Sequence, residues 1–216
     1  MTTPGQSLRA QQNAARNERA AHNRDRYGSL LGPIVTTVGK QSHTEKAYAA
    51  GAAGEERIGA IIDKTVTGTG LALHSRLPSP TATRGDIDHI AITPAGIYVI
   101  DSKNYARNAI ATTHRRTSIT VGGHDGTKLL NGADKQRQRL TRALAGLNAT
   151  DVPVTAIICF TTATGLGLRG RITVNDITIT TAKRLPRLLA TSGPYTNHDI
   201  AWLYQHLAQL FPPVPS

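Results

Sequence analysis

Cysteine is nearly absent from this chain, whose 216 residues include only Cys159. A single thiol cannot form an internal disulfide, so disulfide-stapled secreted scaffolds are excluded, and the apolar run 154–160 around it indicates a core position. No apolar run approaches the roughly 20 residues of a membrane-spanning helix. Residues 1–27 also lack the apolar segment of a secretion signal. These absences predict a protein of the reducing cytoplasm that has no membrane partner.

Acidic and aromatic residues are scarce as well. The chain has 14 acidic against 25 basic residues, which gives a net charge of +11, and only six Tyr, two Phe and one Trp. An excess of positive charge favours a polyanionic partner such as nucleic acid. The shortage of stacking rings favours contacts with a duplex backbone or a short substrate over a single-strand stacking groove.

The positive charge is concentrated in one part of the sequence. Between residues 103 and 142, nine basic residues stand against two acidic ones. This excess predicts a basic surface, although the run 135–142 also fits the solvated face of an amphipathic helix. The positions that we expect to contact nucleic acid are Arg107, Arg115, Arg116, Lys128, Lys135 and Arg139.

Two acidic residues, Asp88 and Asp101, stand on either side of a predicted β-hairpin. Between them, β-branched stretches flank a Pro-Ala-Gly turn at 94–96, a pattern typical of antiparallel strands. An even-numbered loop would pair Asp88 with Asp101 on one face, with Cβ atoms roughly 5 Å apart, whereas an odd-numbered loop would put them on opposite faces. Because like charges repel at that distance, the even register predicts a cation between them. Solvent-facing or capping acids are the alternative.

Lys103 extends this group, because residues two apart on a strand share a face. Oxygen ligands without thiolates suit a hard cation, and we expect Mg²⁺ or Mn²⁺. Such an ion polarises a phosphodiester and lowers the pKa of bound water, while a nearby ammonium orients that water or stabilises developing charge. The pattern predicts phosphodiester hydrolysis, unless Lys103 is an ordinary residue at the end of a strand.

Four ordered motifs resemble those of a known family. They are Gly-Ala-Ala-Gly-Glu at 51–55, Gly-Asp-Ile-Asp-His-Ile at 85–90, Ile-Tyr-Val-Ile-Asp-Ser-Lys-Asn at 97–104 and Asn-Gly-Ala-Asp-Lys-Gln at 131–136. Over residues 48–185 the chain resembles the nuclease-related domain (NERD) family of the PD-(D/E)xK nuclease superfamily. It departs from the family pattern in having Asp rather than Glu at position 101, and Gly after Asn131 with one extra residue before Gln136.

The resemblance implies an α/β fold, a restriction-endonuclease-like αβββαβ core with a mixed central sheet flanked by helices. It also implies roles for the residues of the motifs. Asp88 and Asp101 would hold the metal with the carbonyl of Ser102, and Glu55 would bind a second ion or its water. Lys103 would position or activate the attacking water.

Helical spacing supports two further assignments. Apolar positions three and seven residues after Glu55 would aim its carboxylate along the buried stripe of a helix. Gln136 stands at the head of a similar stripe, and the resemblance implies that it orients the site or touches the substrate backbone. The alternatives are a glutamate that favours the helix dipole and a structural amide. His89 alternates away from Asp88, so we expect it to be packed or hydrogen-bonded rather than a ligand.

The sequence divides into three parts: a basic N-terminal tail or helix at 1–45, a NERD-like nuclease domain at 46–190, and a C-terminal helix and tail at 191–216. A GxGxxG pattern at 165–170 is followed by a strand-like segment where nucleotide binding needs a helix, so we do not expect it to bind a nucleotide. In chain order we predict a helix at 47–64, a strand at 70–76, the hairpin 87–103, a strand near 118–121, a helix at 134–147, strands at 153–160 and 171–180, and helices at 182–189 and 197–210.

Together these observations predict a divalent-metal-dependent nuclease, a hydrolase that binds DNA and cleaves its phosphodiester bonds. RNA is an alternative substrate for the same chemistry. A second alternative is a nucleic-acid-binding or scaffold module of the same fold, in which catalysis is weak or absent. Nothing in the sequence indicates an oligomer.

Overall fold

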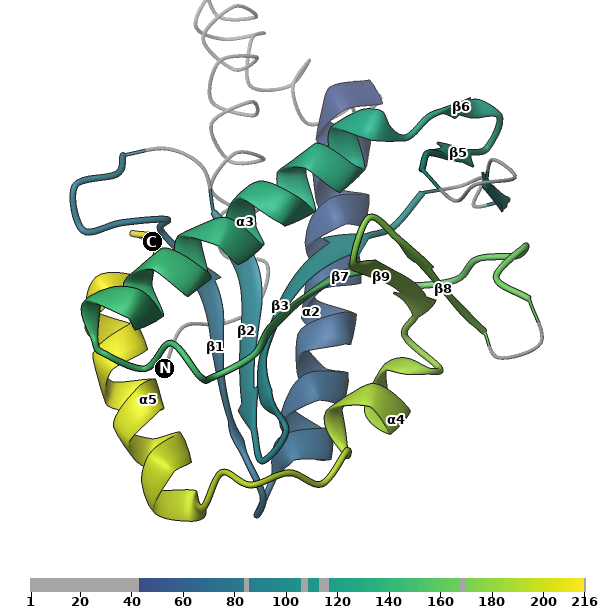
Figure 1. Ribbon diagram of the computed structural model, residues 1–216. Helices are drawn as coiled ribbons and strands as arrows, with labels where there is room; N and C mark the ends of the chain where they lie inside the picture. The colour runs from purple at the N-terminus through teal and green to yellow at the C-terminus, as the bar shows by residue number, and fades with distance from the viewer. Residues whose placement is uncertain (1–42, 84–85, 106–108, 113–116, 168–169, 216) are drawn as a thin grey trace, which may run out of the picture.

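Helices cover both faces of a six-stranded sheet, which makes this an α/β fold (Figure 1). The computed structural model describes residues 43–83, 86–105, 109–112, 117–167 and 170–215. In chain order the elements are α2 (His43–Val66), β1 (Leu71–Arg76), β2 (Ile87–Thr93), β3 (Gly96–Lys103), β4 (Ile110–Thr112), β5 (Ile119–Val121), β6 (His124–Asp125), α3 (Thr127–Gly146), β7 (Val154–Phe160), β8 (Arg171–Val174), β9 (Ile177–Thr181), α4 (Leu185–Leu189) and α5 (Asn197–Leu210). The predicted αβββαβ core is present as α2, β1 to β3, α3 and β7.

The six-stranded sheet is mixed, as predicted. Its strand order is β1-β2-β3-β7-β9-β8. Strands β1, β2 and β3 run antiparallel, β7 lies parallel to both β3 and β9, and β8 is antiparallel to β9. The connection from β3 to the parallel strand β7 contains α3, because parallel neighbours need a long crossover. A three-stranded sheet, β4-β5-β6, is inserted in this connection before α3.

A two-residue turn sets the register between β2 and β3. The hydroxyl of Thr93 accepts a hydrogen bond from the amide of Ala95 at 3.2 Å and donates one to the carbonyl of Gly96 at 3.1 Å. Gly96 has a φ of 123°, which side chains disfavour. Ile92 therefore pairs with Ile97, as the even-numbered loop predicted.

Alternation along the strands divides the core into two clusters. Ile97 and Val99 of β3 belong to the cluster with residues of α3 and α5, whereas Ile100 belongs to the cluster with residues of α2 and α4. Figure 1 shows α3 in front of the sheet and α2 behind it. We call these two sides the α3 face and the α2 face of the sheet.

The helix α3 begins earlier than predicted. It starts at Thr127 and not near residue 134. Asn131 and Gly132 resemble a helix break in the sequence, but Leu130 and Ala133 continue the buried stripe across them. Burial of that stripe outweighs the weak helix propensity of the two residues.

The segment 171–180 was wrongly predicted as one strand and is the hairpin β8–β9. Asn175 and Asp176 form its turn with positive φ angles of 48° and 62°. Both residue types tolerate this conformation, and such turns match the twist of a hairpin. The short strands β4 and β6 were not predicted, while β5 was.

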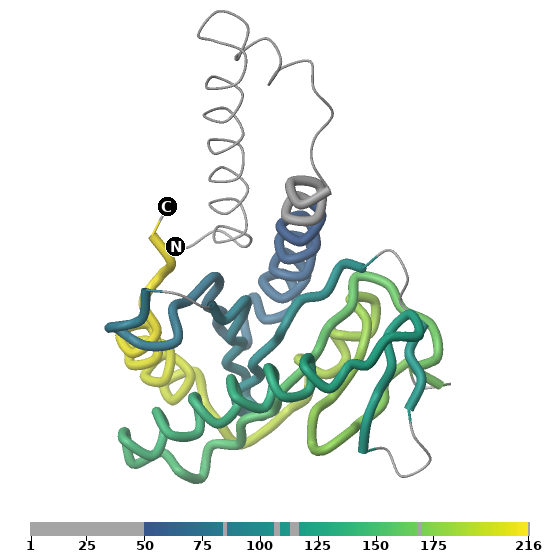
Figure 2. Tube along the Cα trace, turned by 90° about the horizontal axis from the view of Figure 1, so that it is seen from above, coloured from purple at the N-terminus to yellow at the C-terminus, as the bar shows by residue number. Residues whose placement is uncertain are grey.

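The C-terminal helix α5 spans Asn197–Leu210, as predicted, and begins with a capping box between Thr196 and Asp199. Beyond it the chain returns to the edge of the sheet, where the amide of Val214 donates a hydrogen bond to the carbonyl of Ser75 at 3.0 Å. Figures 1 and 2 place α5 and the three-stranded sheet at opposite ends of the described fold. Within the described residues no helix is both long and apolar enough to cross a membrane.

Candidate active site

The two predicted acidic residues come together where β2 begins and β3 ends. His89 pairs with Ile100 and Ile90 with Val99, so the same register brings Asp88 opposite Asp101. The amide of Ser102 donates a hydrogen bond to Oδ2 of Asp88 at 2.7 Å. This bond joins the start of β2 to the end of β3 and excludes the odd-numbered loop.

Lys103 lies directly beside Asp101. Its ammonium donates a hydrogen bond to Oδ1 of Asp101 at 2.7 Å, and the two side chains are only 19% and 14% exposed. Burial alone would lower the pKa of Lys103, but the carboxylates of Asp101 and Asp88 outweigh burial and raise that pKa above its usual value. Lys103 is therefore a fixed cation in this structure and can donate hydrogen bonds, but cannot accept a proton.

The ionised form of Asp88 is disfavoured by its surroundings. Burial raises its pKa well above the usual carboxyl value, and the negative charges of Asp101, Glu55 and Asp86 raise it further, while Lys103 lowers it. A group of carboxylates that disfavour one another's ionisation is stabilised by an added cation. The oxygen donors of Asp88 and Asp101 are of the type that Mg²⁺ and Mn²⁺ prefer.

A metal ion at this position would be coordinated by fewer than three acidic or histidine side chains. In the part of the chain that the structure describes, no group of three or more His, Cys, Asp or Glu residues is arranged to hold a metal ion. Two carboxylates can still suffice for Mg²⁺, which usually keeps several waters and binds substrate phosphates. The residues present therefore fit a hard divalent ion that retains exchangeable positions.

Glu55 reaches the same region from α2. It lies on the buried stripe of the helix, 1% exposed, as its spacing predicted. The hydroxyl of Ser75 donates a hydrogen bond to its Oε1 at 2.8 Å. Ser75 has a φ of 48°, an unfavourable conformation for a serine, which often marks a functional site. The charge of Glu55 raises the pKa of Asp88, so the two carboxylates act on each other through space.

Gln136 points inward but does not open a helix. Because α3 begins at Thr127, Gln136 lies in its third turn. Its Nε2 donates a long hydrogen bond of 3.4 Å to the carbonyl of Asp86, just before β2. Its Oε1 is buried without a hydrogen-bond partner among the described residues. Gln136 thus contacts the segment that leads to Asp88.

Asn104 is a site residue to which sequence reasoning gave no role. Its Nδ2 donates a hydrogen bond to the carbonyl of Ala50 in α2 at 2.7 Å, and its Oδ1 accepts one from the hydroxyl of Thr161 at 2.6 Å. Gly54 makes this contact possible, because a Cβ there would lie 2.5 Å from the Cβ of Asn104. Both residues of this contact are present in the sequence motifs, as the glycine before Glu55 and the Asn after Lys103.

A chain of hydrogen bonds on the α2 face ends at Ser102 in β3. Nε2 of His74 lies 2.9 Å from Oδ1 of Asp63, the two Nδ1 atoms of His74 and His89 are 2.8 Å apart, and Nε2 of His89 lies 2.9 Å from Oγ of Ser102. We call it the histidine chain. Burial and the neighbouring His74 hold the pKa of His89 well below its usual value.

The donor and acceptor roles in the histidine chain depend on the tautomers of its two rings. A carboxylate can only accept, so the bond between His74 and Asp63 carries its proton on Nε2 of His74. Between the two Nδ1 atoms one ring donates and the other accepts, and the tautomer decides which. His89 is hydrogen-bonded, as predicted, but its link through His74 to Asp63 was not foreseen, since no spacing rule connects these positions.

The predicted basic residues of α3 form a stripe. Lys128, Lys135 and Arg139 are exposed and, with Arg142, follow one another at intervals of seven, four and three residues, so they share one side of the helix. We call these four residues the α3 stripe. Arg107, Arg115 and Arg116 lie outside the described residues.

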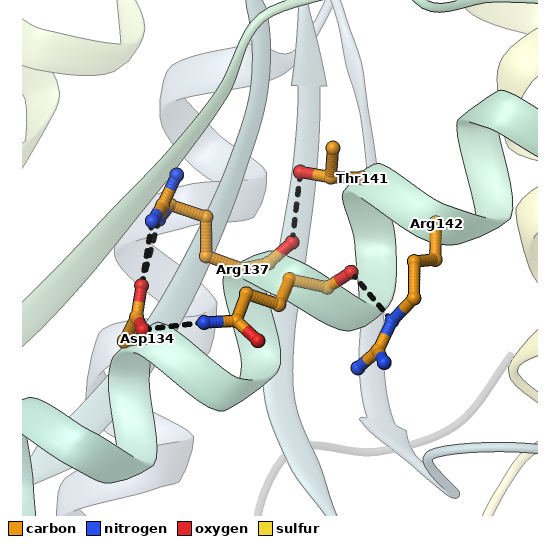
Figure 3. A network of polar contacts seen from close by, with 5 residues as sticks. Asp134, Arg137, Thr141 and Arg142 are labelled. Atoms are coloured by element: carbon orange, nitrogen blue, oxygen red, sulfur yellow. Dashed lines mark hydrogen bonds and ion pairs between the residues drawn. The ribbon is translucent and has the colours of Figure 1, made fainter.

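Figure 3 shows why Arg137 does not belong to the α3 stripe. Its guanidinium donates two hydrogen bonds to Oδ1 of Asp134, at 2.6 and 3.1 Å, which neutralises its charge. Nε of Arg142 donates instead to the backbone carbonyl of Gln138 at 3.2 Å. Arg142 therefore keeps a cationic charge that no carboxylate in the figure balances.

Comparison with known proteins identified one family. The family model for the nuclease-related domain (NERD) matches residues 50–161, just over half of the chain. Searches of curated proteins and of solved structures gave no match. The matched range begins in α2, ends after β7, and includes Glu55, Asp88, Asp101, Lys103 and Gln136.

Proposed function

Since the chain belongs to the nuclease-related domain family, we propose that it hydrolyses phosphodiester bonds of DNA in a reaction that requires a divalent metal. The observation that carries this proposal is the meeting of Asp88, Asp101 and Lys103 at the ends of β2 and β3, with a 2.7 Å bond from Lys103 to Asp101. Two carboxylates and a fixed ammonium are the groups that such a hydrolysis needs.

Each side chain has a task in this proposal. Asp88, Asp101 and the carbonyl of Ser102 would hold Mg²⁺ or Mn²⁺, and Glu55 would bind a second ion or its water. The bound metal supplies a Lewis acid that polarises the phosphodiester and acidifies water. Lys103 remains protonated, because nearby carboxylates raise its pKa, and it orients water or stabilises negative charge on the reacting phosphate.

Gln136 positions the segment before Asp88 in this proposal. The hydrogen bond from its Nε2 to the carbonyl of Asp86 supports a positioning role over direct contact with the reacting atoms.

The α3 stripe supports a nucleic-acid substrate. It lies on the helix that covers the catalytic face of the sheet, and its exposed cations suit phosphate contacts that do not read sequence. With four such contacts, the logarithm of the binding constant would fall linearly with the logarithm of the salt concentration, with a slope of about −3.6. We place the reaction in the reducing cytoplasm, because Cys159 is a free and buried thiol.

The test is cleavage of supercoiled plasmid, linear duplex, single-stranded DNA and RNA by the purified protein, in Mg²⁺, Mn²⁺ or EDTA. We expect DNA cleavage that needs metal and disappears in Asp101→Ala. Asp151→Ala, which removes an exposed acid outside the site, is the matched control and should cleave normally.

Retained DNA binding without cleavage of any substrate would instead support a binding or scaffold module. The α3 stripe favours this second function as much as the first, because it does not depend on the carboxylates. Cleavage of RNA alone would keep the chemistry and correct the substrate.

A further inference from the structure

A cavity lies on the far side of β1 from the acidic pair. It is bounded by the C-terminal end of α2, the edge strand β1 and α5, and its volume is about 380 Å³. Volumes of this order hold a small molecule. The residues on its wall that carry the argument are Asp63, Val66, Leu71, His74, Arg76 and Tyr204.

Arg76 is the unusual residue of this cavity. Its side chain is only 7% exposed, and its Nε is buried without an acceptor. Among the described residues it forms no side-chain hydrogen bond and no ion pair. Burial lowers its pKa, and the neighbouring phenol of Tyr204 opposes this effect. A buried cation without an anion is unfavourable, and folded proteins normally pair such a group.

The one carboxylate on the cavity wall is already engaged. Oδ1 of Asp63 lies 2.9 Å from Nε2 of His74, and Asp63 does not act on the pKa of Arg76. The guanidinium therefore lacks a counter-ion from the wall. A guanidinium offers a planar fork of donors that matches the two oxygens of a carboxylate or phosphate.

The remaining wall is largely apolar. Val66 and Leu71 contribute aliphatic surface beside the polar end formed by Arg76 and Tyr204. A wall with one cationic end and one aliphatic side suits a ligand with one anionic group and a small apolar body. A duplex backbone does not fit this description, because Arg76 is buried whereas the α3 stripe is exposed.

We propose that this cavity binds a small organic oxyanion, whose carboxylate or phosphate group sits on Arg76 and whose apolar body lies against Val66 and Leu71. This site is separate from the acidic pair and does not depend on the nuclease activity. His74 lies on the cavity wall and belongs to the histidine chain. A bound ligand would therefore contact a residue that is linked by hydrogen bonds, through His89, to Ser102 in β3.

The experiment measures binding of four probes to the full chain in EDTA, by calorimetry and by thermal shift. Phenyl phosphate and benzoate carry the two candidate anionic groups on one ring, benzamide is the neutral ring of matched shape, and inorganic phosphate lacks the apolar body. We expect one of the two anionic rings to bind at least tenfold more tightly than benzamide and inorganic phosphate. Which of them binds distinguishes a phosphate from a carboxylate ligand.

Three variants locate the binding. Arg76→Met keeps an apolar stem but removes the charge, and should reduce affinity at least tenfold without lowering the melting temperature of the free protein. Leu71→Trp, at an exposed position on the wall, should block the cavity while leaving Arg76 in place. Arg187→Gln, which removes an exposed charge outside both the cavity and the α3 stripe, is the control and should bind normally.

Any of the following results would overturn the proposal. They are equal binding of benzamide and the anionic rings, unchanged binding in both Arg76→Met and Leu71→Trp, and no binding of any probe to the unaltered chain. Unfolding of Arg76→Met together with normal binding in Leu71→Trp would also overturn it, because Arg76 would then be structural. None of these results depends on DNA cleavage, so the outcome is independent of the proposed function.

Discussion

The two faces of the sheet contribute differently to the candidate active site. On the α3 face the site residues are charged and partly exposed, as in the pair of Lys103 and Asp101. On the α2 face they are buried, as are His74 at 7% exposure and His89 at 0%. The first group has the chemical properties of a reaction centre, and the second has those of a support that holds it. Changes on the α3 face should therefore alter activity more than stability, and changes on the α2 face should do the reverse.

The largest effect should come from Lys103→Met on the α3 face. Loss of the fixed ammonium removes charge stabilisation at the reacting phosphate, and we expect cleavage to fall about 10²- to 10³-fold. Initial cleavage rates in Mg²⁺ measure this effect. Lys183→Met, which removes an exposed lysine, is the control and should cleave normally. A loss of less than tenfold would contradict the assignment of Lys103 to the reaction centre.

The next effect should come from His89→Leu on the α2 face. This change leaves Nδ1 of His74 and Oγ of Ser102 without their partner inside the fold. We expect the free energy of unfolding to fall by about 2–3 kcal/mol, measured by urea denaturation. The double variant His74→Leu with His89→Leu should lose less than the sum of the single variants, because it removes both members of one pair. Additive losses would show that the histidine chain is not a unit.

The difference between the two faces can also be tested by replacing one helical glycine on each of them. Gly54→Ala in α2 would place a Cβ 2.5 Å from the Cβ of Asn104, and we expect a loss of stability of about 1–3 kcal/mol with reduced cleavage. Gly132→Ala in α3 meets no atom within 4 Å. It should stabilise the protein by about 0.5–1 kcal/mol and leave cleavage unchanged. Thermal unfolding of both variants measures the difference, and effects of equal sign would contradict it.

The smallest effect should be a gain in stability from Asp88→Asn without metal. The pKa of Asp88 in the folded protein lies above its usual 3.8, so ionised Asp88 destabilises the fold, and this loss of stability grows as the pH rises above about 4. Asparagine can still accept the bond from the Ser102 amide. In EDTA at neutral pH we expect a melting temperature higher by about 2–4 °C, with the difference vanishing at low pH. A lower melting temperature in EDTA would contradict the strain at Asp88.

Local patterns predicted the hairpin on the α3 face but left two registers open. Alternation paired Asp88 with Asp101 only for an even-numbered loop, and the two-residue turn of the structure selects that register. The same rules placed Glu55 on the buried stripe of α2. The start of α3 could not be predicted in this way, because Asn131 and Gly132 look like a break and only tertiary burial overrides them.

The α2 face was harder to predict because its contacts join distant positions. His74 and His89 are fifteen residues apart on paired strands, and histidines have no spacing rule that reveals such a bond. Nothing in the sequence distinguishes Arg76 from any other arginine at the end of a strand. Only the structure shows that no side chain among the described residues pairs with its guanidinium.

Asn104 has a consequence for the order of folding. Its two hydrogen bonds span 54 and 57 residues, and they reach Ala50 and Thr161, the first and last residues that the family model matches. Contacts of such long sequence separation require large loops to close and so form late. A chain that has folded its hairpin but not yet docked α2 and β7 would have Asp101 and Lys103 in place without the two hydrogen bonds of Asn104. The nuclease we propose would thus gain its complete site only at the last stage of folding.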